Sequence, residues 1–199
     1  MSLRGRRTSQ DRSIDKRPQI PSILIICEGE RTEPEYFLQF KVTKDVSGLA
    51  MNTLSLVKET IAIRRSKGGT NFEQVWCVFD LDSFSKQNFD DAIRLAQQNN
   101  IKTAYSNESF ELWYVLHFDY LQAQVDRKQY MTILDSRLGR KYRKKDMAMY
   151  DLLLTRQPQA IANAQRLLEV HHQQHLSHSE KKPSTTVHEL VQELNKYVK

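Results

Sequence analysis

Two short apolar runs constrain the fold of this chain more than any other feature of its 199 residues. Residues 22–27 read SILIIC and residues 74–79 read QVWCVF. Runs of this length without polar alternation are typical of strands buried on both faces, as in parallel sheets. Further strands are expected at 101–105 (IKTAY) and at 50–57 (AMNTLSLV).

Helical patterns alternate with these strands. After the first strand, Thr32 and Glu35 have the spacing of a capping box, and Pro34 suits a first helical turn. Helices are also expected at 58–67 and at 88–99. This alternation predicts an α/β fold, in which helices flank a parallel sheet and connect its strands through right-handed crossovers.

The second half of the chain has mostly helical patterns. Helices are expected at 109–122, across about 127–176, and at 185–198. We therefore predict one α/β domain over residues 19–199, with a helical C-terminal extension from about residue 120. Residues 1–18 have almost no apolar content and are expected to form a basic, disordered arm.

Positive charge is concentrated in two segments. Residues 1–18 carry six basic and two acidic residues, which is +4 of the net charge of +6. The second segment is denser, with six cations in nine residues: Arg137, Arg140, Lys141, Arg143, Lys144 and Lys145. Either segment could be a solvated surface or a site that neutralises nucleic-acid phosphates.

Several classes of protein are excluded by composition. No apolar run is long enough to span a membrane, and the Arg-rich N-terminus lacks the apolar core of a signal peptide. The two cysteines, Cys27 and Cys77, lie within expected strands and are too few for a Cys-rich zinc module. We expect a reduced, cytoplasmic protein with no membrane partner.

Acidic residues follow the two best-defined strands. Glu28 and Gly29 follow the first, and the second ends in Asp80-Leu81-Asp82. Because parallel strands place their carboxyl ends at one edge of the sheet, these carboxylates are expected to converge there. Such a cluster repels itself unless a cation neutralises it, and oxygen ligands without His or Cys favour Mg²⁺ or Mn²⁺. Each motif alone is common in loops, but together they predict a metal site.

The combination of strand–Glu-Gly and strand–Asp-x-Asp resembles the TOPRIM fold of topoisomerases, primases and several nucleases. Four stretches also resemble the RloB-like proteins: ICEGERTEPEYF, VWCVFDLDSF, YSNESFELWYVLHF and KPSTTVHELVQEL. These motifs lie between residues 23 and 194. The sequence departs from the family's usual pattern at Glu108 and Ser109, where the family has a proline followed by a small residue.

The resemblance implies a TOPRIM-type, Mg²⁺-dependent nuclease or nuclease-like subunit from bacterial restriction or phage-defence loci. It also implies an ATPase partner of the AAA or ABC type. In related nucleases, the Glu-Gly glutamate and the Asp-x-Asp pair hold metal, joined by the glutamate of a Thr-Glu dipeptide and by an acid after a later strand. The matching positions here are Glu28, Asp80, Asp82, Glu33, and Glu108 or Glu111.

Two functions of different classes remain open. The leading hypothesis is a nuclease that hydrolyses RNA, including tRNA, or DNA, with Glu28, Asp80 and Asp82 as catalytic residues and Glu33 and Glu111 as further metal ligands. The alternative is a catalytically silent subunit that binds nucleic acid or a partner. A receiver-like phosphoacceptor domain is disfavoured, because the IKTAYSN strand has no lysine at its end.

Overall fold

The computed structural model describes residues 22–42, 44–66, 72–81 and 85–198. They contain one five-stranded sheet with the strand order β2-β1-β3-β4-β5. Its strands are β1 (Ile23–Cys27), β2 (Lys44–Gly48), β3 (Gln74–Asp80), β4 (Lys102–Asn107) and β5 (Ser184–Thr185). Strands β1 to β4 are parallel, whereas β5 pairs antiparallel with β4. The predicted α/β class is confirmed, but the sheet is mixed rather than wholly parallel.

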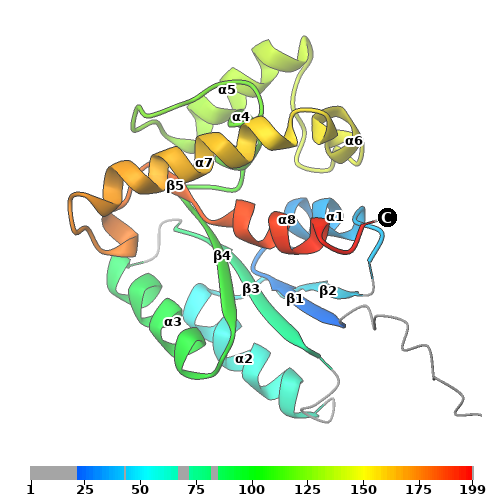
Figure 1. Ribbon diagram of the computed structural model, residues 1–199, viewed down its shortest axis with the longest axis vertical. Helices are drawn as coiled ribbons and strands as arrows, with labels where there is room; N and C mark the ends of the chain where they lie inside the picture. The colour runs from blue at the N-terminus through cyan, green and yellow to red at the C-terminus, as the bar shows by residue number, and fades with distance from the viewer. Residues whose placement is uncertain (1–21, 43, 67–71, 82–84, 199) are drawn as a thin grey trace, which may run out of the picture.

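Helices cover both faces of the sheet (Figure 1). One face carries α2 (Thr53–Ser66) and α3 (Lys86–Gln98), and the other carries α1 (Thr32–Leu38) and α8 (Val187–Asn195). The remaining helices form a group whose core is continuous with the α1 and α8 side. They are α4 (Glu111–Val115), α5 (Arg127–Leu138), α6 (Met149–Leu154) and α7 (Gln157–His172), and a short 3-10 helix follows at His178–Glu180.

Alternate residues of the central strands enter different cores. In β1, Ile23 and Ile25 pack in the core formed with α1, α4 and α8, whereas Leu24 and Ile26 pack in the core formed with α2 and α3. All five residues of β1 are buried. Burial on both faces explains why this strand is a continuous apolar run rather than an alternating one.

The strand expected at 50–57 is wrong. The second strand is β2, at Lys44–Gly48, and α2 already begins at Thr53. Strand β2 has the polar sequence KDVSG and is only partly buried at the edge of the sheet. It therefore lacks the apolar run by which the buried strands are recognised, and the apolar residues Leu56 and Val57 belong to the buried face of a helix.

The helical second half is more interrupted than expected. Gly139 ends α5 in the left-handed conformation (φ 64°), which is a common helix stop, and a loop runs from there to α6. The helix expected at 109–122 is limited to α4. The two-residue strand β5 precedes α8 and was not predicted, because two residues carry no periodic signal.

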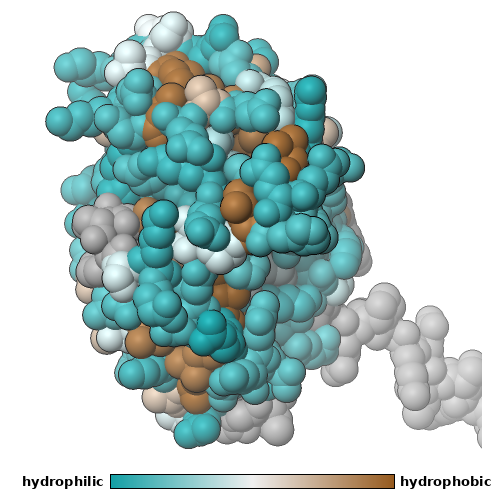
Figure 2. Space-filling model, turned by 90° about the vertical axis from the view of Figure 1, so that its left-hand side faces the viewer, coloured by the Kyte–Doolittle hydropathy of each residue, from teal (hydrophilic) through white to brown (hydrophobic). Residues whose placement is uncertain are grey.

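Cys27 and Cys77 are both buried free thiols. No helix among the described residues is long and apolar enough to cross a membrane. The face of the molecule seen in Figure 2 is mostly hydrophilic, with apolar side chains in small separate areas. The predicted basic arm (1–18) and the predicted ligand Asp82 lie outside the described residues.

Candidate functional site

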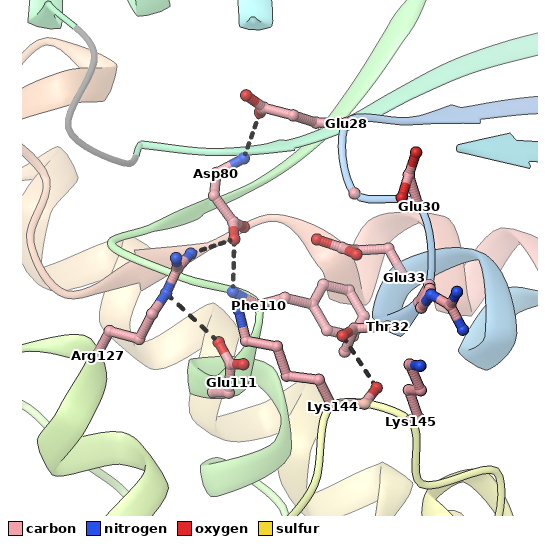
Figure 3. A pocket seen from close by; sticks show the side chains of 12 residues that line it. Glu28, Glu30, Thr32, Glu33, Asp80, Phe110, Glu111, Arg127, Lys144 and Lys145 are labelled. Atoms are coloured by element: carbon pink, nitrogen blue, oxygen red, sulfur yellow. Dashed lines mark hydrogen bonds and ion pairs between the residues drawn. The ribbon is translucent and has the colours of Figure 1, made fainter. Parts of the chain in front are cut away.

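A cavity of about 370 Å³ lies at the carboxyl ends of β1, β3 and β4 (Figure 3). Glu28 follows β1, Asp80 is the last residue of β3, and Phe110 comes shortly after the end of β4. The parallel order of these strands predicts that such residues meet at one edge of the sheet. The start of α1, the start of α5 and the loop after α5 complete its walls. The lining residues are Glu28, Gly29, Glu30, Arg31, Thr32, Glu33, Asp80, Phe110, Glu111, Arg127, Lys144 and Lys145.

Asp80 is the last residue of β3 and is buried. Its Oδ2 accepts hydrogen bonds from the backbone N–H of Phe110 (3.1 Å) and from Nη2 of Arg127 (3.2 Å). The other oxygen, Oδ1, is buried but has no hydrogen-bond partner among the described residues. Because a buried polar atom is costly to leave unpaired, Oδ1 is suited to a further ligand such as a cation or water.

Glu28 directly follows β1 and forms hydrogen bonds with the end of β3. Its backbone N–H donates to the carbonyl of Val78 (2.8 Å), which extends the ladder between the two strands. Its side-chain Oε2 accepts from the backbone N–H of Asp80 (3.2 Å) and from the Thr53 hydroxyl (3.4 Å). In this conformation Glu28 therefore contacts the backbone of Asp80 rather than its carboxylate (Figure 3).

Two glycines make room for the loop that carries these acids. A Cβ at Gly29 would lie 2.2 Å from Oε2 of Glu33, so Gly29 allows that carboxylate to pack against the loop. A Cβ at Gly48, the last residue of β2, would lie 2.2 Å from the carbonyl oxygen of Gly29. The close approach of β2 to the loop after β1 therefore requires glycine at Gly48.

Glu33 lies in the first turn of α1 and is buried. Burial is the main cause that raises its pKa, and the negative charge of Glu111 raises it further, while Lys144 and Arg127 act in the opposite direction. The pKa of Asp80 is also raised, first by burial and then by the charges of Glu33 and Glu111. Burial and the repulsion between neighbouring carboxylates therefore both disfavour the charged forms of these two acids.

Replacing Glu33 with glutamine should stabilise the protein at neutral pH. A raised pKa means that the folded state binds the proton more tightly than the unfolded state, so stability falls as pH rises from the usual value of glutamate through the raised one. We expect Glu33→Gln to melt a few degrees above wild type at pH 7, since 1 kcal/mol shifts Tm by about 2–4 °C in a chain of this size.

Thermal unfolding between pH 4 and pH 8 checks this prediction. The difference between Glu33→Gln and wild type should shrink toward pH 4, where the glutamate is protonated in wild type. Glu35→Gln, on the same helix but outside the cavity, controls for the loss of a glutamate from α1. A difference that grows toward pH 4 would contradict the sign of the shift.

Glu111 is the later acid that lines the cavity. It begins α4 and is 3% exposed, and its Oε1 accepts from the Tyr142 hydroxyl (3.4 Å). Its Oε2 forms an ion pair with Nε of Arg127 (3.9 Å). Glu108, the alternative left open by the sequence, forms an ion pair with Lys182 and does not line the cavity. The geometry favours Glu111 over Glu108.

Lys144 and Lys145 form the basic wall of the cavity. They lie in the loop between α5 and α6, and the carbonyl of Lys144 accepts a hydrogen bond from the Thr32 hydroxyl (3.1 Å). Thr32 is the first residue of α1 and does not cap it, so the expected capping box is wrong. Tyr142 is buried and anchors the same loop, as its N–H donates to Oδ1 of Asp135 (2.6 Å).

The other predicted phosphate-binding cations do not line the acidic cavity. Arg137 forms a two-pronged ion pair with Asp119 (2.6 Å for both contacts), and Arg140 pairs with Asp146. Lys141 and Arg143 are exposed in the loop that carries Lys144 and Lys145. The six cations therefore belong to two groups, one facing the cavity and one on the adjoining surface.

The donor chemistry of the cavity suits a divalent cation, but its acids do not form a closed metal site. Carboxylate oxygens, including the unpaired Oδ1 of Asp80, are the ligands that Mg²⁺ and Mn²⁺ prefer. Within the described ranges, however, no three His, Cys, Asp or Glu residues are grouped so that they could hold an ion. Arg127 contacts both Asp80 and Glu111 instead.

Sequence reasoning brought Glu28, Glu33, Asp80 and Glu111 into consideration, and the structure places all four around one cavity. Their roles as ligands or catalysts stay predictions. Arg127 was missed, because a single Arg at the start of a helix between polar residues carries no distinctive signal. The sequence signal that could have drawn attention to this position is Asp126. Aspartate is a favoured N-cap residue, so it predicts that a helix begins at Arg127.

One comparison with known proteins gives a match. The model of a family described as RloB-like protein matches residues 23–194, which is most of the chain. No curated protein and no solved structure matches the chain.

Proposed function

The chain belongs to the RloB-like protein family, and from this premise we propose that it is a metal-dependent nuclease of the TOPRIM type. It hydrolyses phosphodiester bonds of RNA, including tRNA, or of DNA, in the bacterial cytoplasm. Its role is antiviral defence together with an AAA-type or ABC-type ATPase. One observation carries the proposal: a single cavity presents buried carboxylates and, opposite them, Lys144 and Lys145.

The proposed metal is Mg²⁺ or Mn²⁺. Asp80 would hold it through the unpaired Oδ1, together with oxygens from Glu28, Glu33 and Glu111. Asp82, two residues after Asp80, is the further ligand that the family resemblance implies. When bound, the ion supplies charge neutralisation and Lewis-acid activation at the phosphate.

The chain's own cations would bind the substrate. Lys144 extends into the cavity (Figure 3). Its charge lies close enough to Glu33 to offset part of the rise in the pKa of that acid. Together with Lys145, which also lines the cavity, Lys144 would contact phosphates next to the bond to be cleaved. Lys141 and Arg143, exposed on the same loop, would bind phosphates further along the strand.

The alternative is a catalytically silent subunit that uses the same surface to bind nucleic acid or a partner. The observation in its favour is that Arg127 already pairs with two of the acids, so the cluster is partly neutralised without a metal ion. A silent subunit would bind nucleic acid through Lys144 and Lys145 and would leave it intact.

A cleavage assay separates the two functions. The purified protein is incubated with tRNA and with single- and double-stranded DNA, in Mn²⁺, in Mg²⁺ and with excess EDTA. The proposal predicts cleavage of at least one substrate that EDTA abolishes. Binding of the same substrates without cleavage, also when an ATPase encoded beside the protein is added, would favour the silent subunit.

A further inference from the structure

We propose that Arg127 is an internal counter-ion of the cavity, which a divalent cation must displace from Asp80 and Glu111 in order to bind. The inference rests on the proposed metal dependence and adds a positioning residue to the same site. It makes Arg127 a competitor of the metal, so that the removal of its guanidinium group should tighten metal binding.

The contacts of Arg127 place its charge between two buried acids of the cavity. Asp80 is 8% exposed and Glu111 is 3% exposed. Arg127 donates from Nη2 to Oδ2 of Asp80 (3.2 Å), and its Nε lies 3.9 Å from Oε2 of Glu111 (Figure 3). Asp80 ends β3 and Glu111 begins α4, and the guanidinium group joins these two elements.

A metal ion and Arg127 cannot share these carboxylates without a cost. Both are cations, and two like charges within a few ångströms of each other repel strongly in a buried site. Within the part of the chain that the structure describes, Oδ1 of Asp80 has no partner, while Oδ2 is held by Arg127 and by the backbone N–H of Phe110. An ion that approaches Oδ1 therefore meets the guanidinium group on the other oxygen of the same carboxylate.

The side chain of Arg127 can move while its helix stays in place. Helix α5 is fixed at its start by a capping box, in which Oδ1 of Asp126 accepts from the backbone N–H of Gln129 (2.9 Å). The Arg127 side chain is 30% exposed, unlike the acids that it contacts. Among the described residues, its displacement breaks the ion pairs with Asp80 and Glu111, and the apolar core does not depend on them.

The displaced guanidinium group stays at the wall of the cavity, because Arg127 is the first residue of α5. Lys144 and Lys145 lie in the same cavity, so the three cations would then be available to a phosphate-bearing strand. Arginine is well suited to this second position, because its planar fork matches phosphate oxygens as well as carboxylates. Metal entry would in this way release a cation toward the substrate.

Calorimetric titration with Mn²⁺ alone tests the proposal in the full-length chain. We expect Arg127→Gln to bind Mn²⁺ about tenfold more tightly than wild type, which corresponds to about 1.4 kcal/mol. Arg127→Lys, which keeps a cation but not the two-pronged contact, should lie between them. Arg137→Gln removes an arginine that is paired with Asp119 outside the cavity, and its affinity should equal that of wild type.

Circular dichroism on each variant establishes that the fold is retained before the titration. Equal or weaker Mn²⁺ binding by a folded Arg127→Gln, with saturable binding by wild type, overturns the role of Arg127 and leaves the proposed nuclease function standing. Binding by neither protein overturns both. Tighter binding by Arg127→Gln together with an unchanged Arg137→Gln supports the displacement.

Discussion

Replacing Asp80 with asparagine should abolish nucleic-acid cleavage, with a loss of at least about 10³-fold in rate. Asp80 is the proposed metal ligand whose carboxylate has a buried oxygen with no hydrogen-bond partner in the described ranges. A metal ion contributes several kcal/mol to stabilisation of the transition state, and 4 kcal/mol corresponds to about 10³-fold in rate. The amide oxygen of asparagine can still accept from the Phe110 N–H, so the fold should be kept.

Rates of cleavage by Asp80→Asn and by Asp119→Asn, measured under the same conditions, check this prediction. Asp119 is also paired with an arginine, Arg137, but lies outside the cavity. Its substitution should leave cleavage within a few-fold of wild type. Nucleic-acid binding by Asp80→Asn should be unchanged or stronger, because a negative charge is removed. A variant that still cleaves at the wild-type rate would exclude Asp80 from catalysis.

Reversing the charge of the basic wall should cost most of the nucleic-acid affinity. For Lys144→Glu combined with Lys145→Glu we expect binding weaker by on the order of 100-fold at low salt, because two phosphate contacts become repulsive. The salt dependence should flatten as well. Each lost contact lowers the slope of log K against log[salt] by about 0.7–0.9, so the pair should lower it by about 1.4–1.8.

Fluorescence anisotropy over a salt series gives both quantities. The matched control is Lys58→Glu combined with Arg65→Glu, which reverses two exposed cations on α2, on the other face of the sheet. Both double variants change the net charge equally, so a difference in affinity between them must come from local contacts with the nucleic acid. Equal losses of affinity in the two variants would show that binding depends on net charge alone and would remove Lys144 and Lys145 from the site.

Much of the cavity could be predicted from the sequence, because it depends on strand topology. The runs that end at Cys27 and near Asp80 are apolar on both faces, so they had to be central parallel strands. Their carboxyl ends then had to share an edge, which brings Glu28 and Asp80 together before any side-chain detail is known.

The remaining features depend on tertiary contacts that leave little trace in the sequence. Strand β2 is polar because it lies at the sheet edge, so its residues carry no apolar pattern. The dense cluster at 137–145 resembles a solvated helix, yet Gly139 ends the helix and the buried Tyr142 anchors a loop that turns Lys144 toward the acids. Arg127 meets Asp80 from 47 residues away in the chain.

The most direct test of the account is a calorimetric titration of metal-free wild-type protein and Asp80→Asn with Mn²⁺. It needs neither a guessed substrate nor a partner, and it addresses the claim on which the proposed function depends: that the acidic cavity at the ends of β1 and β3 binds a divalent cation. The account predicts saturable binding by wild type that is lost in Asp80→Asn. The same isotherm for both proteins, or no binding by either, would contradict it.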